Sequence, residues 1–149
     1  TRYDSGRVLH ALDLSPTMVE IAATKLGERA EVVAGDMRDL SHIASGSVAA
    51  VISFFAVHHL SPTDVATAFA EWHRVLRPGG QLVIAAWEGV GTIDYGEESD
   101  LIARRYSADE LSTWVRDASL VIDRCVVEPV EDFPMEAIYL EAHRIEPTA

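Results

Sequence analysis

The stretch Arg7-Val8-Leu9-His10-Ala11-Leu12-Asp13 decides the fold, together with a later stretch of the same form, Ala30-Glu31-Val32-Val33-Ala34-Gly35-Asp36. Each is a strand-like run that leads into an aspartate, and a helix-like segment separates them. Ligands of an open parallel sheet bind outside the carboxyl ends of its strands, where an acid typically accepts from ribose hydroxyls. A second acid one strand further over can accept from an exocyclic amine such as that of adenine. The two stretches therefore predict an adenosine pocket.

The segment between the two strands has the signals of a helix. Ser15-Pro16 is typical of an N-cap followed by proline at the first helical position. Met18, Ile21, Ala22 and Leu26 keep helical spacing, and Gly27 is a plausible end.

Strands and helices continue to alternate along the chain. Val48 to Phe55 is an almost continuous apolar run, which predicts a strand covered on both faces. Ser61-Pro62-Thr63-Asp64 begins a second helix, and Pro78-Gly79-Gly80 ends it. A further buried strand is expected at Gln81 to Trp87. This alternation predicts a doubly wound α/β layer.

The last third of the chain begins with a glycine-rich, acidic stretch, Glu88 to Asp100, which reads as a loop. Ser107 with Glu110 opens a third helix. Two closing strands, Val121 to Val127 and Ala137 to Ala142, follow without a helix between them. One of them is therefore expected to run antiparallel to its neighbours.

Composition narrows the function. At 149 residues and 48% hydrophobic content, the chain suits one domain, residues 1–149. A net charge of −12 makes nucleic acid an unsuitable partner and fits a small or cationic ligand better. The single cysteine, Cys125, favours a reducing cytoplasm. Neither a membrane-spanning run nor a signal-peptide pattern is visible, so no membrane partner is expected.

Five motifs in order give the chain a family resemblance. They are Leu12-Asp13-Leu14-Ser15-Pro16-Thr17-Met18, Gly35-Asp36-Met37, Phe55-Ala56-Val57-His58-His59-Leu60, Val75-Leu76-Arg77-Pro78-Gly79-Gly80 and Arg105-Tyr106-Ser107-Ala108-Asp109-Glu110-Leu111. Together they resemble a class I S-adenosylmethionine-dependent methyltransferase of the small-molecule type. The resemblance implies a Rossmann-like, mostly parallel sheet with an antiparallel final strand, and S-adenosylmethionine as cofactor with S-adenosylhomocysteine as product.

The resemblance also implies roles for individual residues. In that family the acid after the second strand binds the cofactor ribose, a role that falls on Asp13. The acid after the third strand binds the adenine amine, a role for Asp36, and the next N–H, that of Met37, serves a ring nitrogen. Phe54 and Phe55 would line the methionine end. Leu14, Met18 and Gly35 are assigned to the same pocket, although core packing is the competing interpretation of Met18.

His58 and His59 stand where the fourth strand of the family fold releases into the substrate cleft. Either can serve as a general base, because an unperturbed histidine titrates near pH 6.5. The alternative is that both hydrogen-bond the backbone of a turn. Trp87, Tyr95 and Tyr106 flank the expected acceptor region, and the acidic residues Asp94, Glu97, Glu98 and Asp100 either attract a cationic acceptor or form a solvated loop.

One departure from the family concerns the sheet. The family's first strand, glycine-rich loop and following helix would lie before Thr1, so the fold is expected to be truncated at its N-terminus. That strand normally sits between the strands ending at Asp13 and Ser53, and its loss leaves unpaired backbone on both sides. Three outcomes are expected: the sheet closes up, another copy supplies a strand in a homo-oligomer, or the natural protein carries an upstream segment.

Two functions remain open from the sequence. The first is transfer of a methyl group from S-adenosylmethionine to a small-molecule acceptor. The second is a non-catalytic, truncated scaffold that keeps part of the fold and self-associates.

Overall fold

The computed structural model describes residues 6–93 and 102–146 of the chain. The chain divides into two compact units, Thr1–Leu40 and Ser41–Ala149, and each is described by itself.

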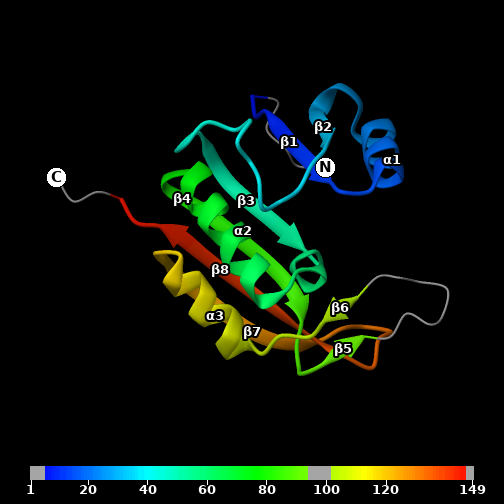
Figure 1. Cartoon of the computed structure of the whole chain (residues 1–149), viewed down its shortest axis with the longest axis vertical. Helices are drawn as coiled ribbons and strands as arrows, with labels where there is room; N and C mark the ends of the chain where they lie inside the picture. Colours follow the sequence, from blue (N-terminus) through cyan, green and yellow to red (C-terminus); the bar gives the residue numbers. More distant parts are fainter. Residues whose placement is uncertain (1–5, 94–101, 147–149) are drawn as a thin grey trace. The chain divides into compact units, whose positions relative to one another are not determined.

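The first unit is a β–α–β arrangement (Figure 1). Strand β1 (Leu9–Asp13), helix α1 (Pro16–Leu26), the short 3₁₀ turn η1 (Gly27–Arg29) and strand β2 (Ala30–Ala34) follow one another. The two strands are parallel, and Asp13 lies opposite Ala34. Both strands predicted to end near an aspartate are thus confirmed, with their carboxyl ends at the same edge.

Local signals set the limits of α1. The Ser15 hydroxyl accepts from the N–H of Met18, Pro16 occupies the first turn, and Gly27 ends the helix with φ of 54°. A left-handed φ of this kind suits glycine, which has no Cβ to clash. The interpretation of Met18 as a core residue is wrong, however, because no residue of α1 is buried and the Met18 side chain is 49% exposed.

The second unit is built on a four-stranded mixed sheet in the order β3-β4-β8-β7. These strands are β3 (Val48–Phe54), β4 (Leu76–Trp87), β7 (Leu120–Pro129) and β8 (Glu136–Arg144). Strand β3 pairs with β4 in parallel, whereas β8 is antiparallel to both of its neighbours. The expected antiparallel closing strand is therefore β8.

Helices α2 (Pro62–Val75) and α3 (Ala108–Asp117) lie on the same face of this sheet (Figure 1). Their buried side chains include Phe69 and Trp72 from α2 and Leu111 and Val115 from α3. The α3 helix begins with a complete capping box, in which the Ser107 hydroxyl accepts from the Glu110 N–H and the Glu110 carboxylate accepts from the Ser107 N–H. Leu82, Ile84, Ile138 and Leu140 complete the core from the sheet.

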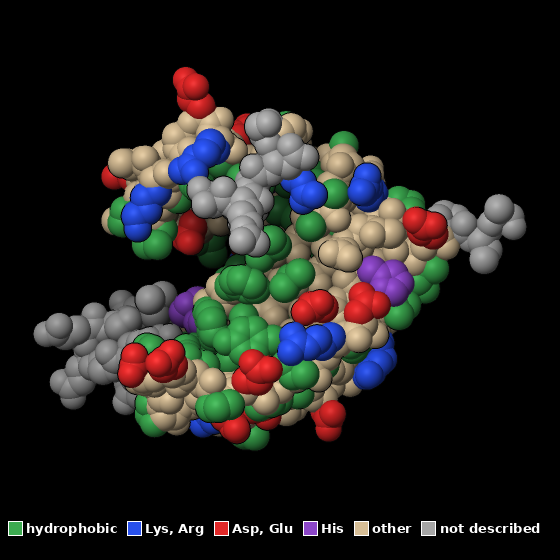
Figure 2. Space-filling model, turned by 180° about the vertical axis from the view of Figure 1, so that it is seen from behind, with side chains coloured by type: hydrophobic (Ala, Val, Ile, Leu, Met, Phe, Trp, Pro, Cys, Tyr) green, Lys and Arg blue, Asp and Glu red, His purple; other side chains and the backbone are tan. Residues whose placement is uncertain are grey.

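The prediction that β3 is covered on both faces is wrong. Ala49, Ala50, Ile52 and Phe54 are all exposed, the last two at 59% and 58%. In Figure 1, α2 and α3 lie in front of the strands. Figure 2 views the molecule from behind, and hydrophobic side chains gather on the side that it shows. An apolar run cannot reveal which face lacks a covering layer, because both faces of such a strand look alike in sequence.

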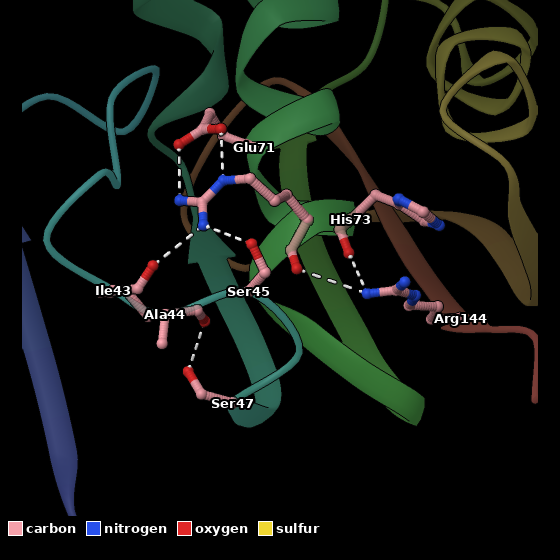
Figure 3. A network of polar contacts seen from close by, with 8 residues as sticks. Ile43, Ala44, Ser45, Ser47, Glu71, His73 and Arg144 are labelled. Atoms are coloured by element: carbon pink, nitrogen blue, oxygen red, sulfur yellow. Dashed lines mark hydrogen bonds and ion pairs between the residues drawn. The ribbon is translucent and has the colours of Figure 1, made fainter.

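Arg74 and Arg144 hold the end of α2 (Figure 3). The Arg74 guanidinium donates to the Glu71 carboxylate at 2.7 Å and to the Ile43 carbonyl at 2.9 Å. The Arg144 guanidinium donates to the carbonyls of His73 and Leu76 at 3.0 and 2.6 Å. The last carbonyls of a helix have no partner within it. Arg144, at the end of β8, supplies that partner and fastens the helix to the sheet.

Within the described residues, strand β1 pairs with β2 alone and β3 pairs with β4 alone. The three expectations for the sheet, that it closes up, that another copy supplies a strand, or that the natural protein carries an upstream segment, stay predictions.

Candidate functional site

Asp13 ends β1, and its carboxylate is only partly used. Its Oδ1 accepts from the N–H of Ser15 at 2.8 Å, so the side chain helps to start α1. Its Oδ2 has no hydrogen bond within the described residues, and the residue is exposed. A carboxylate can accept about four hydrogen bonds. Asp13 therefore stabilises the turn that leads into α1 through Oδ1, and its Oδ2 can still accept a hydrogen bond from a ligand hydroxyl.

Gly35 joins the two strand ends. Its N–H donates to the Asp13 carbonyl at 3.1 Å, which fixes the segment after β2 beside the end of β1. A Cβ placed on Gly35 would lie 3.6 Å from the Leu12 Cβ, an ordinary contact. The chain itself therefore tolerates a side chain at this position.

Asp36 is more fully engaged than the sequence suggested. Its Oδ1 accepts from the Arg38 N–H at 2.9 Å, and the Arg38 Nε donates to Oδ1 and Oδ2 at 3.0 and 2.9 Å. Such fork-like pairing uses most of the acceptor capacity of a carboxylate. This pairing was not predicted from the sequence, because it depends on the path of the turn between Asp36 and Arg38.

Two backbone donors lie beside these acids. The N–H groups of Leu14 and Met37 make no hydrogen bond within the described residues. The Leu14 side chain is 62% exposed and that of Met18 49% exposed. The first unit thus combines a free carboxylate oxygen, two free donors and two accessible apolar side chains near adjoining strand ends.

Phe54 and Phe55 follow different courses at the end of β3. The Phe54 side chain is exposed, whereas the Phe55 ring lies 4.6 Å from the Trp87 ring between centroids. Phe55 has φ of 50°, which is uncommon for a non-glycine residue, and its N–H donates to the Ala85 carbonyl at 2.8 Å. The turn therefore directs the two rings differently: Phe54 is exposed, and Phe55 is half-buried against Trp87.

His58 is buried in the 3₁₀ turn η2 (Val57–His59), with 3% of its side chain exposed. Its Nδ1 has no hydrogen-bond partner. Burial, and to a smaller extent the neighbouring His59, lowers the pKa of His58 from 6.5 to about 4. His58 is consequently neutral near pH 7.

His59 is exposed, and its Nδ1 lies 3.2 Å from the Ile102 carbonyl oxygen. A carbonyl oxygen can only accept, so Nδ1 carries the proton of this hydrogen bond. In the neutral ring the lone pair is then on Nε2, which is the atom able to take a proton. The contact is to a segment 43 residues away and not to the turn that contains His59.

Among the residues expected near the acceptor, the structure describes Tyr106 and Trp87 but not Tyr95. Tyr106 is 4% exposed, its hydroxyl donates to the Leu60 carbonyl, and its ring meets Trp114 edge-on with centroids 5.0 Å apart. Tyr106 is therefore held as a core residue. Tyr95 and the four acids Asp94, Glu97, Glu98 and Asp100 lie outside the described residues.

The sequence analysis missed two short strands, β5 (Thr92–Ile93) and β6 (Ala103–Arg104), which pair with each other. Strand β6 contacts η2. This brings Arg104 to the segment that carries the histidines, with its guanidinium 3.5 Å from the Leu60 carbonyl oxygen. Strands of two residues give no periodic signal, so the sequence could not predict this position.

Metal and membrane features are absent from the part of the chain that the structure describes. No three histidine, cysteine or carboxylate side chains within residues 6–93 and 102–146 gather in a way that could hold a metal ion. Across the same residues, no helix has the length and apolarity needed to cross a membrane.

Comparison with known proteins now decides the family. The family model described as a methyltransferase domain matches residues 2–84, more than half of the chain. The chain belongs to this family. The predicted relationship to class I S-adenosylmethionine-dependent methyltransferases is confirmed.

A relative in sequence is an uncharacterized methyltransferase of Geobacillus thermodenitrificans, 30% identical over 82 residues. The match covers 55% of this chain and 38% of the relative, so the chain spans about two fifths of the length of this methyltransferase. What the whole protein does is accordingly a matter for proposal.

Solved structures confirm the Rossmann-like α/β fold. An S-adenosylmethionine-dependent methyltransferase of Methanosarcina mazei superimposes with a TM-score of 0.81 at 16% identity, covering 95% of this chain and 84% of that one. The 1,6-didemethyltoxoflavin-N1-methyltransferase of Burkholderia thailandensis, solved with bound 1,6-didemethyltoxoflavin and S-adenosylhomocysteine, superimposes with a TM-score of 0.74 at 23% identity, covering 92% of this chain and 61% of that one. At these identities the likeness concerns the fold alone.

Proposed function

We propose that this chain binds S-adenosylmethionine and transfers its methyl group to a small-molecule acceptor. The observation that carries the proposal is the joined pair of strand ends in the first unit. The hydrogen bond from Gly35 to the Asp13 carbonyl holds the segment after β2 beside the end of β1. In a methyltransferase-family chain, this edge is where a nucleoside binds.

The groups at this edge suit an adenosine. Asp13 Oδ2 can accept from a ribose hydroxyl, while the Met37 N–H can donate to an adenine ring nitrogen. Hydrogen bonds to a charged acceptor contribute roughly 1.5 to 3 kcal/mol each. The donor and acceptor types therefore match the ligand that the family relationship implies.

Asp36 binds the adenine amine in this proposal only if the amine shares the carboxylate with Arg38 or displaces the arginine. The guanidinium already takes both carboxylate oxygens. Asp13 is consequently assigned the larger part of the binding energy, and Asp36 mainly shapes the turn that presents Met37.

The second unit carries the candidate proton acceptors His58 and His59. When bound, S-adenosylmethionine supplies a methyl carbon made electrophilic by its sulfonium. Holding the acceptor nucleophile in line with that carbon supplies most of the acceleration. His59 Nε2 can take a proton from an acceptor that arrives protonated, because Nδ1–H is committed to the Ile102 carbonyl. His58 is the weaker candidate, since its ring is buried.

The competing function is a non-catalytic scaffold. Two observations favour it: the β1–β2 sheet is separate from the four-stranded sheet, and Leu14, Met18, Ile52 and Phe54 are all exposed. A scaffold of this kind would not retain cofactor affinity.

Isothermal titration with S-adenosylhomocysteine separates the two functions. Saturable binding by this chain in the micromolar range supports the methyltransferase. An absence of heat at millimolar ligand, with the protein folded by circular dichroism, contradicts it and favours the scaffold.

A further inference from the structure

Arg104 is unusual among the arginines of this acidic chain. Acids outnumber Lys and Arg by 24 to 12, so arginine side chains have an abundance of carboxylates to pair with. Within the described residues, Arg104 nevertheless makes no ion pair, and its only hydrogen bond is the 3.5 Å contact to the Leu60 carbonyl oxygen. A hydrogen bond of that length is weak.

The other arginines of the described residues are either used or fully in solvent. Arg38, Arg74 and Arg124 pair with carboxylates. Arg29, Arg105 and Arg144 donate to backbone carbonyls at 3.1 Å or less. Arg7, Arg77 and Arg116 are exposed. Arg104 therefore differs from the other arginines of the described residues. It is half-buried, yet its guanidinium makes only one long hydrogen bond to the described part of the chain.

The position of Arg104 is also set by the fold. Strand β6 contacts η2, the turn carrying His58 and His59 directly after β3. The hydroxyl of Tyr106 donates to the same Leu60 carbonyl that Arg104 approaches, and His59 is joined to Ile102, two residues before Arg104. Two polar contacts thus tie the Arg104 segment to the histidine turn.

We propose that Arg104 binds an anionic oxyacid group, a carboxylate or a phosphate, on the molecule that this site accepts. The guanidinium presents planar, paired donors that match the two oxygens of such a group. The guanidinium itself carries a positive charge and makes no ion pair within the described residues, so it can attract a small anion although the protein as a whole is acidic. Naming this molecule as the methyl acceptor rests on the proposed function, whereas the anion site itself does not.

The test uses nuclear magnetic resonance of the whole chain without cofactor, with benzoate and phenyl phosphate as probes. Each probe is titrated while the Arg104 Nε–Hε signal and the amide signals of His59 and Ile102 are followed. Saturable shifts of these signals with benzoate or phenyl phosphate are expected, and the stronger probe identifies the class of anion. Neutral benzamide and cationic benzylamine should leave them unchanged.

Two variants make the result specific. Arg104→Gln should weaken probe binding by about tenfold or more, the loss expected for one charge-assisted contact. Arg77→Gln removes the same charge from an exposed position near the start of β4 and should leave binding unchanged. Equal affinity in Arg104→Gln, no saturable shift with either anion, or binding of benzylamine instead would each overturn the proposal. Because no cofactor is present, these results do not depend on S-adenosylhomocysteine binding.

Discussion

Asp13 shows how one side chain can serve structure and binding together. One carboxylate oxygen caps the turn into α1, and the other has no partner in the described residues. The aspartates were found from the sequence because strand-ending acids in a β–α–β pattern have a recognisable place. The pairing of Asp36 with Arg38 was not predicted from the sequence. A side chain's partner depends on the path of the turn, which residue order alone does not specify.

The buried His58 gives stability a pH dependence. Its pKa is about 4 in the folded chain and near 6.5 when unfolded, so between these values the unfolded state binds the extra proton. The free energy of unfolding should therefore fall as the pH drops from 6.5 towards 4, by on the order of 2 kcal/mol. Urea unfolding at a series of pH values measures this slope.

The matched variants for His58 are His58→Phe and His42→Gln. The first removes the buried imidazole and should flatten the slope, although His73, whose pKa is lowered by burial and by Arg144, contributes in the same direction. The second replaces an exposed histidine and should leave the slope unchanged. A slope in His58→Phe equal to that of the unmodified chain between pH 6.5 and 5 would show that His58 is not its source.

A second residue-level prediction concerns Gly35. Because a Cβ there meets only Leu12 at 3.6 Å, Gly35→Ala should leave the free energy of unfolding within about 1 kcal/mol of its original value. If a nucleoside lies against this turn, the added methyl group should still weaken S-adenosylhomocysteine binding. Calorimetry and urea unfolding on the same sample check both parts; unaltered affinity would remove Gly35 from the site.

At the scale of elements, caps and periodicity predicted the helices well. Ser15, Ser61 and Ser107 each cap a helix as expected, because capping depends on residues three apart in sequence. Burial of Met18 and of both faces of β3 was predicted wrongly, because burial depends on layers contributed by distant parts of a chain. The short β5–β6 pair was missed for lack of any periodic signal.

The α2 helix depends on its contact with β8. Arg144→Met should lower the free energy of unfolding by roughly 1.5 to 3 kcal/mol, because the carbonyls of His73 and Leu76 lose a charged donor. Urea unfolding with an unchanged m value would report this loss. Arg124→Met is the control: its ion pairs are exposed and 3.4 to 3.5 Å long, so less than about 1 kcal/mol is expected. Equal losses in the two variants would contradict the anchoring role.

At the scale of the whole molecule, the two edges of the four-stranded sheet differ in character. The exposed side chains of β3 are Ala49, Ala50, Ile52 and Phe54, whereas β7 carries Asp123, Arg124 and Glu128. Charged side chains discourage strand-to-strand pairing, and an apolar edge invites it. We therefore expect the chain to self-associate through β3.

Light scattering tests this expectation. The chain should give a mass above its own 16.3 kDa, and the double substitution Ile52→Lys with Phe54→Lys should return it to a monomer. Val127→Lys, at a 40% exposed position on β7, should leave the assembly intact. A monomer for the unmodified chain, or dissociation by Val127→Lys alone, would contradict association through β3.

The most direct measurement of the central claim is the affinity of Asp13→Asn for S-adenosylhomocysteine. Asparagine keeps an oxygen for the Ser15 N–H but removes the charge, so stability should change little while affinity falls about tenfold or more. Asp117→Asn, an exposed site on α3, should bind as the unmodified chain does. Equal affinity for Asp13→Asn and the unmodified chain would contradict the assignment of Asp13 to the nucleoside.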